Sequence, residues 1–215
     1  NPGLAMPVIA LVGNKGGAGK TTLCINLASA LAERGATVVL DADPQQSSHN
    51  WHAIADGRSA FPVISASDDV VQLAADHVSS ARYVLIDCPP SVRAQQTSDA
   101  LSRADLALIP VQPSPLDLWA SVQIEAEVGR ARQSNPGLGA LLVINQLEPR
   151  TRLSRNASAW METNRSAWRL RARLSSSMPV PRPTHAAVSP PARAASVAPT
   201  SNHSTRLLQL VPALP

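Results

Sequence analysis

A glycine-rich loop near the amino terminus is the feature that most constrains the fold of this chain. The apolar run at residues 7–13 predicts a buried strand, because a short stretch with Val and Ile ends in glycine. Residues 20–34 then place apolar side chains at helical spacing, and glycine follows. Between them the sequence reads Lys15-Gly16-Gly17-Ala18-Gly19-Lys20-Thr21-Thr22. A strand, a glycine loop and a helix in this order predict a cradle for a phosphate group.

The side chains of this loop predict the chemistry of nucleotide binding. Glycines let successive N–H groups face one anion, and the following helix adds its partial positive charge. Lys20 is predicted to neutralise the β- and γ-phosphates, and the Thr21 hydroxyl to bind Mg²⁺. The predicted cofactors are therefore ATP or ADP and Mg²⁺, with the nucleotide held by Gly16, Gly17, Ala18, Gly19, Lys20, Thr21 and Thr22. A bare glycine turn is the alternative interpretation.

The loop departs from the ordinary Walker pattern. Asn14 stands where that pattern has its first glycine, and an additional lysine, Lys15, precedes the glycines. Lys15 and Lys20 are the only lysines among the nineteen basic residues. Because arginine supplies the charge elsewhere in the chain, a lysine at both positions indicates that a compact ammonium group is required.

Three carboxylates follow predicted strands. Asp41 and Asp43 come after the apolar residues 37–40, and Asp87 follows the run at residues 82–86. Carboxylates beside a phosphate would repel it unless they hold a metal ion or a water molecule. The alternatives are a solvated Asp-Pro turn at residues 43–44 and a simple capping role for Asp87.

Apolar strands alternate with helical stretches over the first two thirds of the chain. The other predicted strands are residues 106–111 and 141–144, and the other predicted helices are residues 69–78, 94–101 and 116–131. This alternation predicts an α/β fold of the P-loop NTPase kind, a mostly parallel sheet with helices on both faces. Ligands bind such sheets at the carboxyl ends of the strands, where the glycine loop and the three aspartates fall.

The loop motif KGGxGKT and the segment Asp41-Ala42-Asp43-Pro44 resemble the ParA/MinD family of deviant Walker ATPases. The resemblance covers roughly residues 6–150. It implies that Lys15 reaches across an ATP-bound homodimer to the phosphates of the partner.

The same resemblance implies roles for the acids. Asp43 would orient or deprotonate the attacking water, so that Lys15, Lys20 and Asp43 form the catalytic set. Asp41 would support the magnesium shell and Asp87 would bind magnesium-bound water, and both would join Thr21 in the metal site.

Two further segments resemble the small plasmid-type members of the family. The stretch at residues 110–117 contains three prolines, which make a stiff extended loop, and its Pro113 is implied to lie near the adenine and the dimer interface. A stiff connector is the alternative. Asn145 stands at the adenine-reading position of the family, where an amide can both donate to and accept from the base edge.

The chain changes character toward its carboxyl end. We predict an ATPase domain over residues 1–159 and an irregular, basic, Pro/Ser/Arg-rich segment over residues 160–215. The first 149 residues hold nine basic and fourteen acidic side chains, whereas residues 150–215 hold ten arginines and one acid, Glu162. This asymmetry suggests contact with a polyanion such as DNA, and a solvated tail is the alternative. Together with the resemblance, it makes Arg150, Arg152 and Arg155 the candidate DNA contacts. A change of reading frame and a divergent tail that packs onto a dimer partner are two hypotheses for this segment.

These features predict a cytoplasmic, nucleoid-associated ATPase of the DNA-segregation type. By the resemblance, ATP would form a homodimer that coats nonspecific DNA, and a ParB-type or small centromere-binding partner would stimulate an otherwise slow hydrolysis. One alternative is a nucleotide-binding module impaired in hydrolysis by an aberrant C-terminus. The other is a positioning ATPase for a protein cargo or a membrane site. No apolar run approaches the ~20 residues that span a bilayer, so we expect no stable membrane association.

Overall fold

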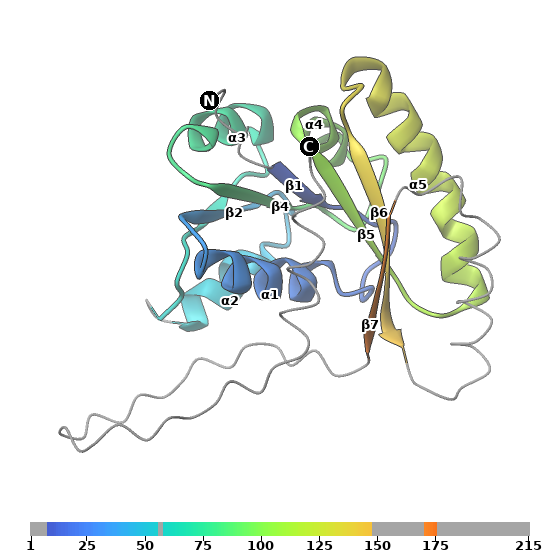
Figure 1. The fold of residues 1–215 in the computed structure, drawn as a ribbon, viewed down its shortest axis with the longest axis horizontal. Coiled ribbons are helices and arrows are strands. Elements are labelled where there is room, and N and C mark those ends of the chain that lie inside the picture. The colour runs from blue at the N-terminus through green and yellow to red at the C-terminus, as the bar shows by residue number, and fades with distance from the viewer. Residues whose placement is uncertain (1–7, 56–57, 148–169, 176–215) are drawn as a thin grey trace.

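The computed structural model describes residues 8–55, 58–147 and 170–175 (Figure 1). Strands and helices alternate along the chain, as the sequence pattern predicts. The elements are β1 (Val8–Leu11), α1 (Lys20–Ala32), β2 (Thr37–Asp41), α2 (Ser47–Ala55), β3 (Val63–Ser65), α3 (Val70–Val78), β4 (Tyr83–Asp87), α4 (Gln95–Arg103), β5 (Leu106–Val111), α5 (Pro115–Ser134), β6 (Gly139–Leu147) and β7 (Leu170–Ser175).

The described strands form one seven-stranded sheet in the order β3-β2-β4-β1-β5-β6-β7. Every pair of neighbouring strands in it is parallel. β1 lies between β4 and β5, so the glycine loop that follows β1 emerges between the ends of those two strands. The register places Asp41 of β2 opposite Asp87 of β4. Two carboxylates therefore end neighbouring strands at the same level of the sheet.

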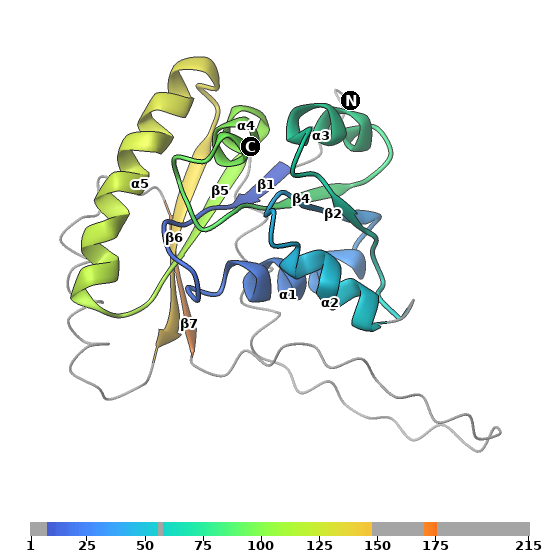
Figure 2. The ribbon, with the colours of Figure 1, turned by 180° about the vertical axis from the view of Figure 1, so that it is seen from behind.

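Helices cover both faces of the sheet, with α1 and α2 on one face and α3, α4 and α5 on the other (Figures 1 and 2). Successive side chains of a strand point to opposite faces, so β1 contributes to two cores. Ile9 and Leu11 join the core under α1, whereas Val8 and Ala10 join the core under α3, α4 and α5. Because both faces are buried, the central strands consist almost entirely of apolar residues.

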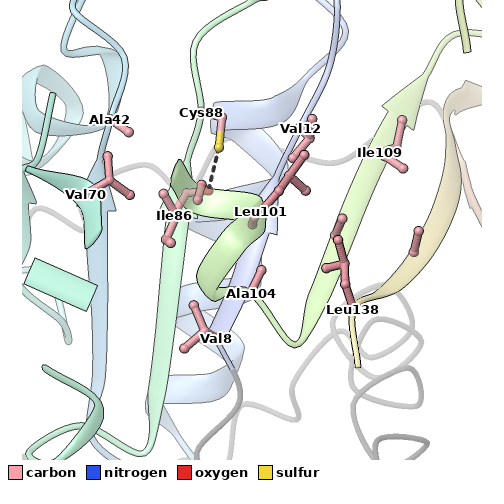
Figure 3. Close-up of a cluster of buried hydrophobic side chains, with 14 of the residues drawn as sticks. Val8, Val12, Ala42, Val70, Ile86, Cys88, Leu101, Ala104, Ile109 and Leu138 are labelled. Atoms are coloured by element: carbon pink, nitrogen blue, oxygen red, sulfur yellow. Dashed lines mark hydrogen bonds between the residues drawn. The ribbon is translucent and has the colours of Figure 1, made fainter. Parts of the chain in front are cut away.

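Figure 3 shows part of the core on the face of α3, α4 and α5, where Val70 and Leu101 lie over the sheet. Cys88 is buried there, and its thiol donates to the carbonyl oxygen of Ile86 at 3.9 Å. Burial raises the pKa of the Cys88 thiol far above its usual value, with Asp87 adding to the effect. Cys24 is free and buried in the opposite core. Both thiols therefore act as apolar packing groups.

The predicted α/β fold is confirmed, and each strand and helix predicted from the sequence is present within a few residues of its predicted bounds. Three elements were not predicted: α2, β3 and β7. β7 lies inside the segment predicted to be irregular and pairs with β6, so the sheet continues past residue 159. Over residues 8–55, 58–147 and 170–175, no helix combines the length and apolar character needed to span a bilayer. Residues 176–215 lie outside the described residues, and so do Arg150, Arg152 and Arg155.

Candidate nucleotide-binding site

The loop between β1 and α1 curls at two glycines whose backbone angles other residues rarely adopt. The angle φ is 76° at Gly17 and 92° at Gly19. A side chain at position 19 would also collide with the amide of Asn145 at the end of β6. Gly19 occupies the N-cap of α1 and has no side chain that could satisfy the first N–H groups of the helix. Those N–H groups are therefore available to an anion.

Lys20 begins α1 and folds back along the loop. Its Nζ donates to the carbonyl oxygen of Lys15 at 3.1 Å, and the residue is 7% exposed. Burial lowers the pKa of Lys20, and the nearby carboxylates of Asp87 and Asp43 oppose this shift. A buried ammonium group with one neutral hydrogen-bond partner among the described residues is poorly solvated, so an incoming phosphate would stabilise it.

Lys15 points away from Lys20 and reaches α5. Its Nζ lies 3.1 Å from Oδ1 of Asp117, and its side chain is 61% exposed. Asp117 is fixed by the start of α5, because its Oδ2 accepts from the Ser114 hydroxyl at 2.8 Å and its N–H donates back to that hydroxyl. The carboxylate is therefore rigidly placed, whereas the exposed lysine can exchange it for another anion.

The turn after β2 is folded around Asp41. Its two oxygens accept from the backbone N–H groups of Asp43 at 3.2 Å and His49 at 2.8 Å. Asp43 accepts from the N–H of Gln45 at 3.0 Å. Asp41 is fully buried, and burial raises the pKa of its carboxyl while the backbone N–H groups oppose the shift. In this structure Asp41 organises the turn that carries Asp43, and its part in a magnesium shell stays a prediction.

Asp87 ends β4 with one oxygen bonded and the other without a partner. The Ser48 hydroxyl donates to Oδ2 at 2.7 Å, while Oδ1 is buried and has no hydrogen-bond partner among the described residues. Burial raises the pKa of Asp87 to about 6, while the hydrogen bond from Ser48 and the nearby Thr21 hydroxyl oppose the shift. A buried carboxylate oxygen without a partner, close to the Thr21 hydroxyl, fits the water shell of a Mg²⁺ ion.

On the opposite side of the loop, the ends of β5 and β6 brace its backbone. Gln112 donates to the carbonyl oxygen of Gly17 at 3.1 Å and to Oε1 of Gln146 at 2.8 Å. Asn145 donates to the carbonyl oxygen of Ala18 at 3.1 Å and accepts from the N–H of Gln146. Two amide side chains therefore hold two consecutive carbonyl groups of the glycine loop.

These groups surround a cavity of about 390 Å³, which is the size of a small-ligand site. It is lined by Gly16, Gly17, Gly19, Lys20, Thr21, Thr22, Asp43, Ser47, Pro90, Asn145 and Gln146. Most of the predicted site residues are thus brought together. Ala18, Asp41 and Asp87 are buried and do not line the cavity, and neither do Lys15 and Pro113.

Sequence reasoning missed three residues that shape this site. Asp117 could have been found, because Ser114 and Asp117 have the spacing of a helix capping pair. Gln112 and Ser48 carry no comparable signal. Their importance comes from contacts with Gly17 and Asp87, which lie far away in the sequence.

The fold and the site together define a P-loop nucleotide-binding protein. Residues 9–179 match the family model of the CobQ/CobB/MinD/ParA nucleotide binding domain, and the chain belongs to this family. The resemblance drawn from the loop motif is thereby confirmed.

Several relatives and solved structures are similar to this chain. It is 39% identical to "Maintenance of carboxysome distribution protein A" of Halothiobacillus neapolitanus, over 72% of this chain and 73% of that protein. It is 33% identical to "Protein ParA" of Rhizobium radiobacter, over 55% of this chain and 54% of that protein. The structure of an ATP-bound McdA variant from Cyanothece superposes with a TM-score of 0.67 at 19% identity, over 81% of this chain and 85% of that one. The last comparison bears on the fold alone.

Proposed function

We propose that this protein is an ATPase whose ATP-bound dimer distributes a protein assembly over nonspecific DNA. The observation that carries the proposal is the contrast between the two lysines of the glycine loop. Lys20 is buried at the cavity, whereas Lys15 is exposed and paired outside the cavity lining. One ammonium group can therefore serve the nucleotide of its own chain while the other is available to the nucleotide of a second copy.

The residues at the cavity have complementary tasks in this proposal. Lys20 and the first N–H groups of α1 bind the phosphates. Thr21 and Asp87 hold Mg²⁺, which when bound neutralises phosphate charge. Asp43 lines the cavity and is 9% exposed, so its carboxylate can orient a water molecule for attack on the terminal phosphate. Asn145 contacts the adenine, and Pro113 lies beside the dimer interface.

The choice of cargo rests on the relatives. The identity of 39% over nearly three quarters of both chains is to a protein whose name assigns it to carboxysome distribution. DNA segregation is the second candidate, because the chain is also 33% identical to a protein named ParA. Both candidate functions share the same cycle of ATP binding and hydrolysis, the same binding to nonspecific DNA, and hydrolysis that a partner protein stimulates. They differ in the object that the partner protein carries.

The first experiment tests the ATP cycle. Light scattering coupled to size exclusion should show a monomer with ADP and a dimer with ATP and Mg²⁺, and Lys15→Ala should abolish the dimer. Hydrolysis should be slow and should rise when DNA and the partner protein are both added. A monomer in every nucleotide state would refute the proposal and favour a nucleotide-binding module.

The second experiment tests DNA binding and the identity of the cargo. Reversing the charges of Arg150, Arg152 and Arg155 together should release the ATP-bound dimer from DNA at moderate salt, because each removed phosphate contact weakens a salt-dependent interaction. Unchanged retention would exclude these arginines. In the organism that carries the gene, its deletion should cluster the protein assembly while a reporter plasmid stays stable. Plasmid loss with a normally distributed assembly would favour DNA segregation.

A further inference from the structure

Ser48 belongs to none of the motifs described above, although its hydroxyl contacts Asp87, an acid of the proposed metal site, directly. It lies in the first turn of α2 and is fully buried. Its hydroxyl donates to Oδ2 of Asp87 at 2.7 Å, across thirty-nine positions in the sequence. Because Oδ1 of Asp87 has no partner among the described residues, this bond leaves Oδ1 as the oxygen that is open to a further donor.

The same stretch of α2 is attached to the neighbouring acid. The N–H of His49 donates to Oδ2 of Asp41 at 2.8 Å, and Asp41 and Asp87 are paired in register on β2 and β4. The first turn of α2 is therefore held by both strand-end acids, one through a backbone N–H and one through the Ser48 hydroxyl. Asp43 lies between β2 and α2, so its position depends on these two attachments.

We infer that Ser48 is a positioning residue for the Mg²⁺ site and couples the metal to the segment that carries Asp43. The bond from Ser48 occupies Oδ2 of Asp87 and leaves Oδ1, which has no partner among the described residues, as the oxygen that would accept from a magnesium-bound water molecule. With Asp87 committed to the metal shell, the same bond would hold the start of α2 and thereby Asp43. This inference rests on the proposed function, because it assumes that ATP binds here with Mg²⁺.

A purely structural role for Ser48 gives a different expectation. A serine that only holds α2 in place would affect nucleotide binding equally with and without the metal. A positioning role changes the Mg²⁺ dependence and leaves metal-free binding untouched. The two roles are therefore separable by titrating Mg²⁺ at a fixed concentration of nucleotide.

The test uses the full chain and the variant Ser48→Ala, with fluorescent ADP as the probe. Loss of a hydrogen bond to a charged group should raise the Mg²⁺ concentration for half-maximal binding by about tenfold. Binding in excess EDTA should stay within twofold of the unchanged protein. Ser29→Ala is the matched control, because it also removes a helical serine hydroxyl, one that donates to the carbonyl oxygen of Ile25 in α1. That control should leave both measurements unchanged.

A second variant, Ser48→Cys, keeps the size of the side chain and replaces the hydroxyl with a weaker donor. It should shift the Mg²⁺ requirement in the same direction by a smaller factor, and it serves if Ser48→Ala does not fold. An unshifted Mg²⁺ requirement, or an equal loss in EDTA, would overturn the role of Ser48. Failure of the unchanged protein to bind nucleotide in a Mg²⁺-dependent way would instead refute the proposed function.

Discussion

The two sides of the glycine loop are built differently. On the side of β2 and β4, Asp41 is fully buried and Asp87 is 1% exposed, and both are held by hydrogen bonds to the start of α2. On the side of β5 and β6, the bonds from Gln112 are exposed, and the ammonium group that pairs with Asp117 belongs to Lys15, whose side chain is 61% exposed. Leu116 beside that pair is 77% exposed.

This difference separates a preformed half of the site from an open half. Burying a carboxylate lowers the free energy of unfolding. A fold that keeps buried carboxylates beside a buried lysine is therefore arranged to bind charged groups before any ligand arrives. An ion pair whose lysine is exposed and an exposed leucine each contribute little to the stability of the single chain. Contact with the surface of another molecule would stabilise both Lys15 and Leu116. The side of β2 and β4 is thus suited to metal and phosphate, and the side of β5 and β6 is suited to contact with another molecule.

The largest effect should come from Lys20→Ala, which removes the buried ammonium group that faces the side of β2 and β4. We expect ATP affinity to fall by about 4 kcal/mol, close to a thousandfold, because a desolvated charge pair with the phosphates is lost. Calorimetric titration measures this loss. Lys15→Ala should keep monomer affinity within a few fold, since its ammonium lies outside the cavity lining. Similar losses in both variants would contradict the division into two halves.

Asp87→Asn should stabilise the nucleotide-free protein. An unfolded Asp has a pKa of 3.8, whereas burial raises the pKa of Asp87 to about 6 in the fold. The folded carboxyl holds its proton more tightly, so the free energy of unfolding should fall as pH rises from about 4 to about 6. At neutral pH the replacement should therefore add about 2 to 3 kcal/mol.

Chemical denaturation at several pH values checks this prediction. Asp76→Asn is the control, because Asp76 is exposed on α3 and its carboxylate accepts a hydrogen bond from the exposed Gln72 side chain. That variant should change stability little. If the Asp87→Asn variant loses as much stability between pH 4 and 6 as the unchanged protein, burial of the Asp87 carboxylate is not what destabilises the fold.

Asp117→Asn should strengthen the proposed ATP-dependent dimer. It keeps the shape of the side chain at the start of α5 and removes the charge that holds Lys15. Because Lys15 is largely exposed, each pair is worth about 0.5 kcal/mol. A symmetric dimer breaks two pairs, about 1 kcal/mol in all, so its dissociation constant should fall by about fivefold. Sedimentation with ATP measures the constant. A weaker dimer would mean that Asp117 belongs to the interface itself and does not compete for Lys15.

The buried half was the easier half to predict from the sequence. Lys20, Thr21 and Asp87 follow apolar strands or open a helix, so local pattern is enough to place them at one edge of a parallel sheet. Ser48 and Gln112 could not be found this way, because their partners are distant in the chain and any small polar residue would satisfy the local pattern. The strand β7 was missed although apolar and basic residues alternate along Leu170–Ser175, since the surrounding residues have no periodic pattern.

The smallest effect should come from Asn145→Ala at the end of β6. The side-chain NH₂ of Asn145 donates one hydrogen to the carbonyl oxygen of Ala18, and its side-chain oxygen accepts from the N–H of Gln146. Within the described part of the chain, one donor hydrogen and one acceptor lone pair of the amide remain free for a ligand. Those positions match the N7 and N6 groups of adenine but face the O6 acceptor of guanine unfavourably. We expect ATP affinity to fall about threefold, or ~0.6 kcal/mol, and GTP affinity to stay unchanged. Gln112→Ala, which removes the neighbouring bond to Gly17, should not alter the ratio of the two affinities. If Asn145→Ala weakens ATP and GTP equally, the amide only holds the glycine loop, and the open side of the site does not read the base.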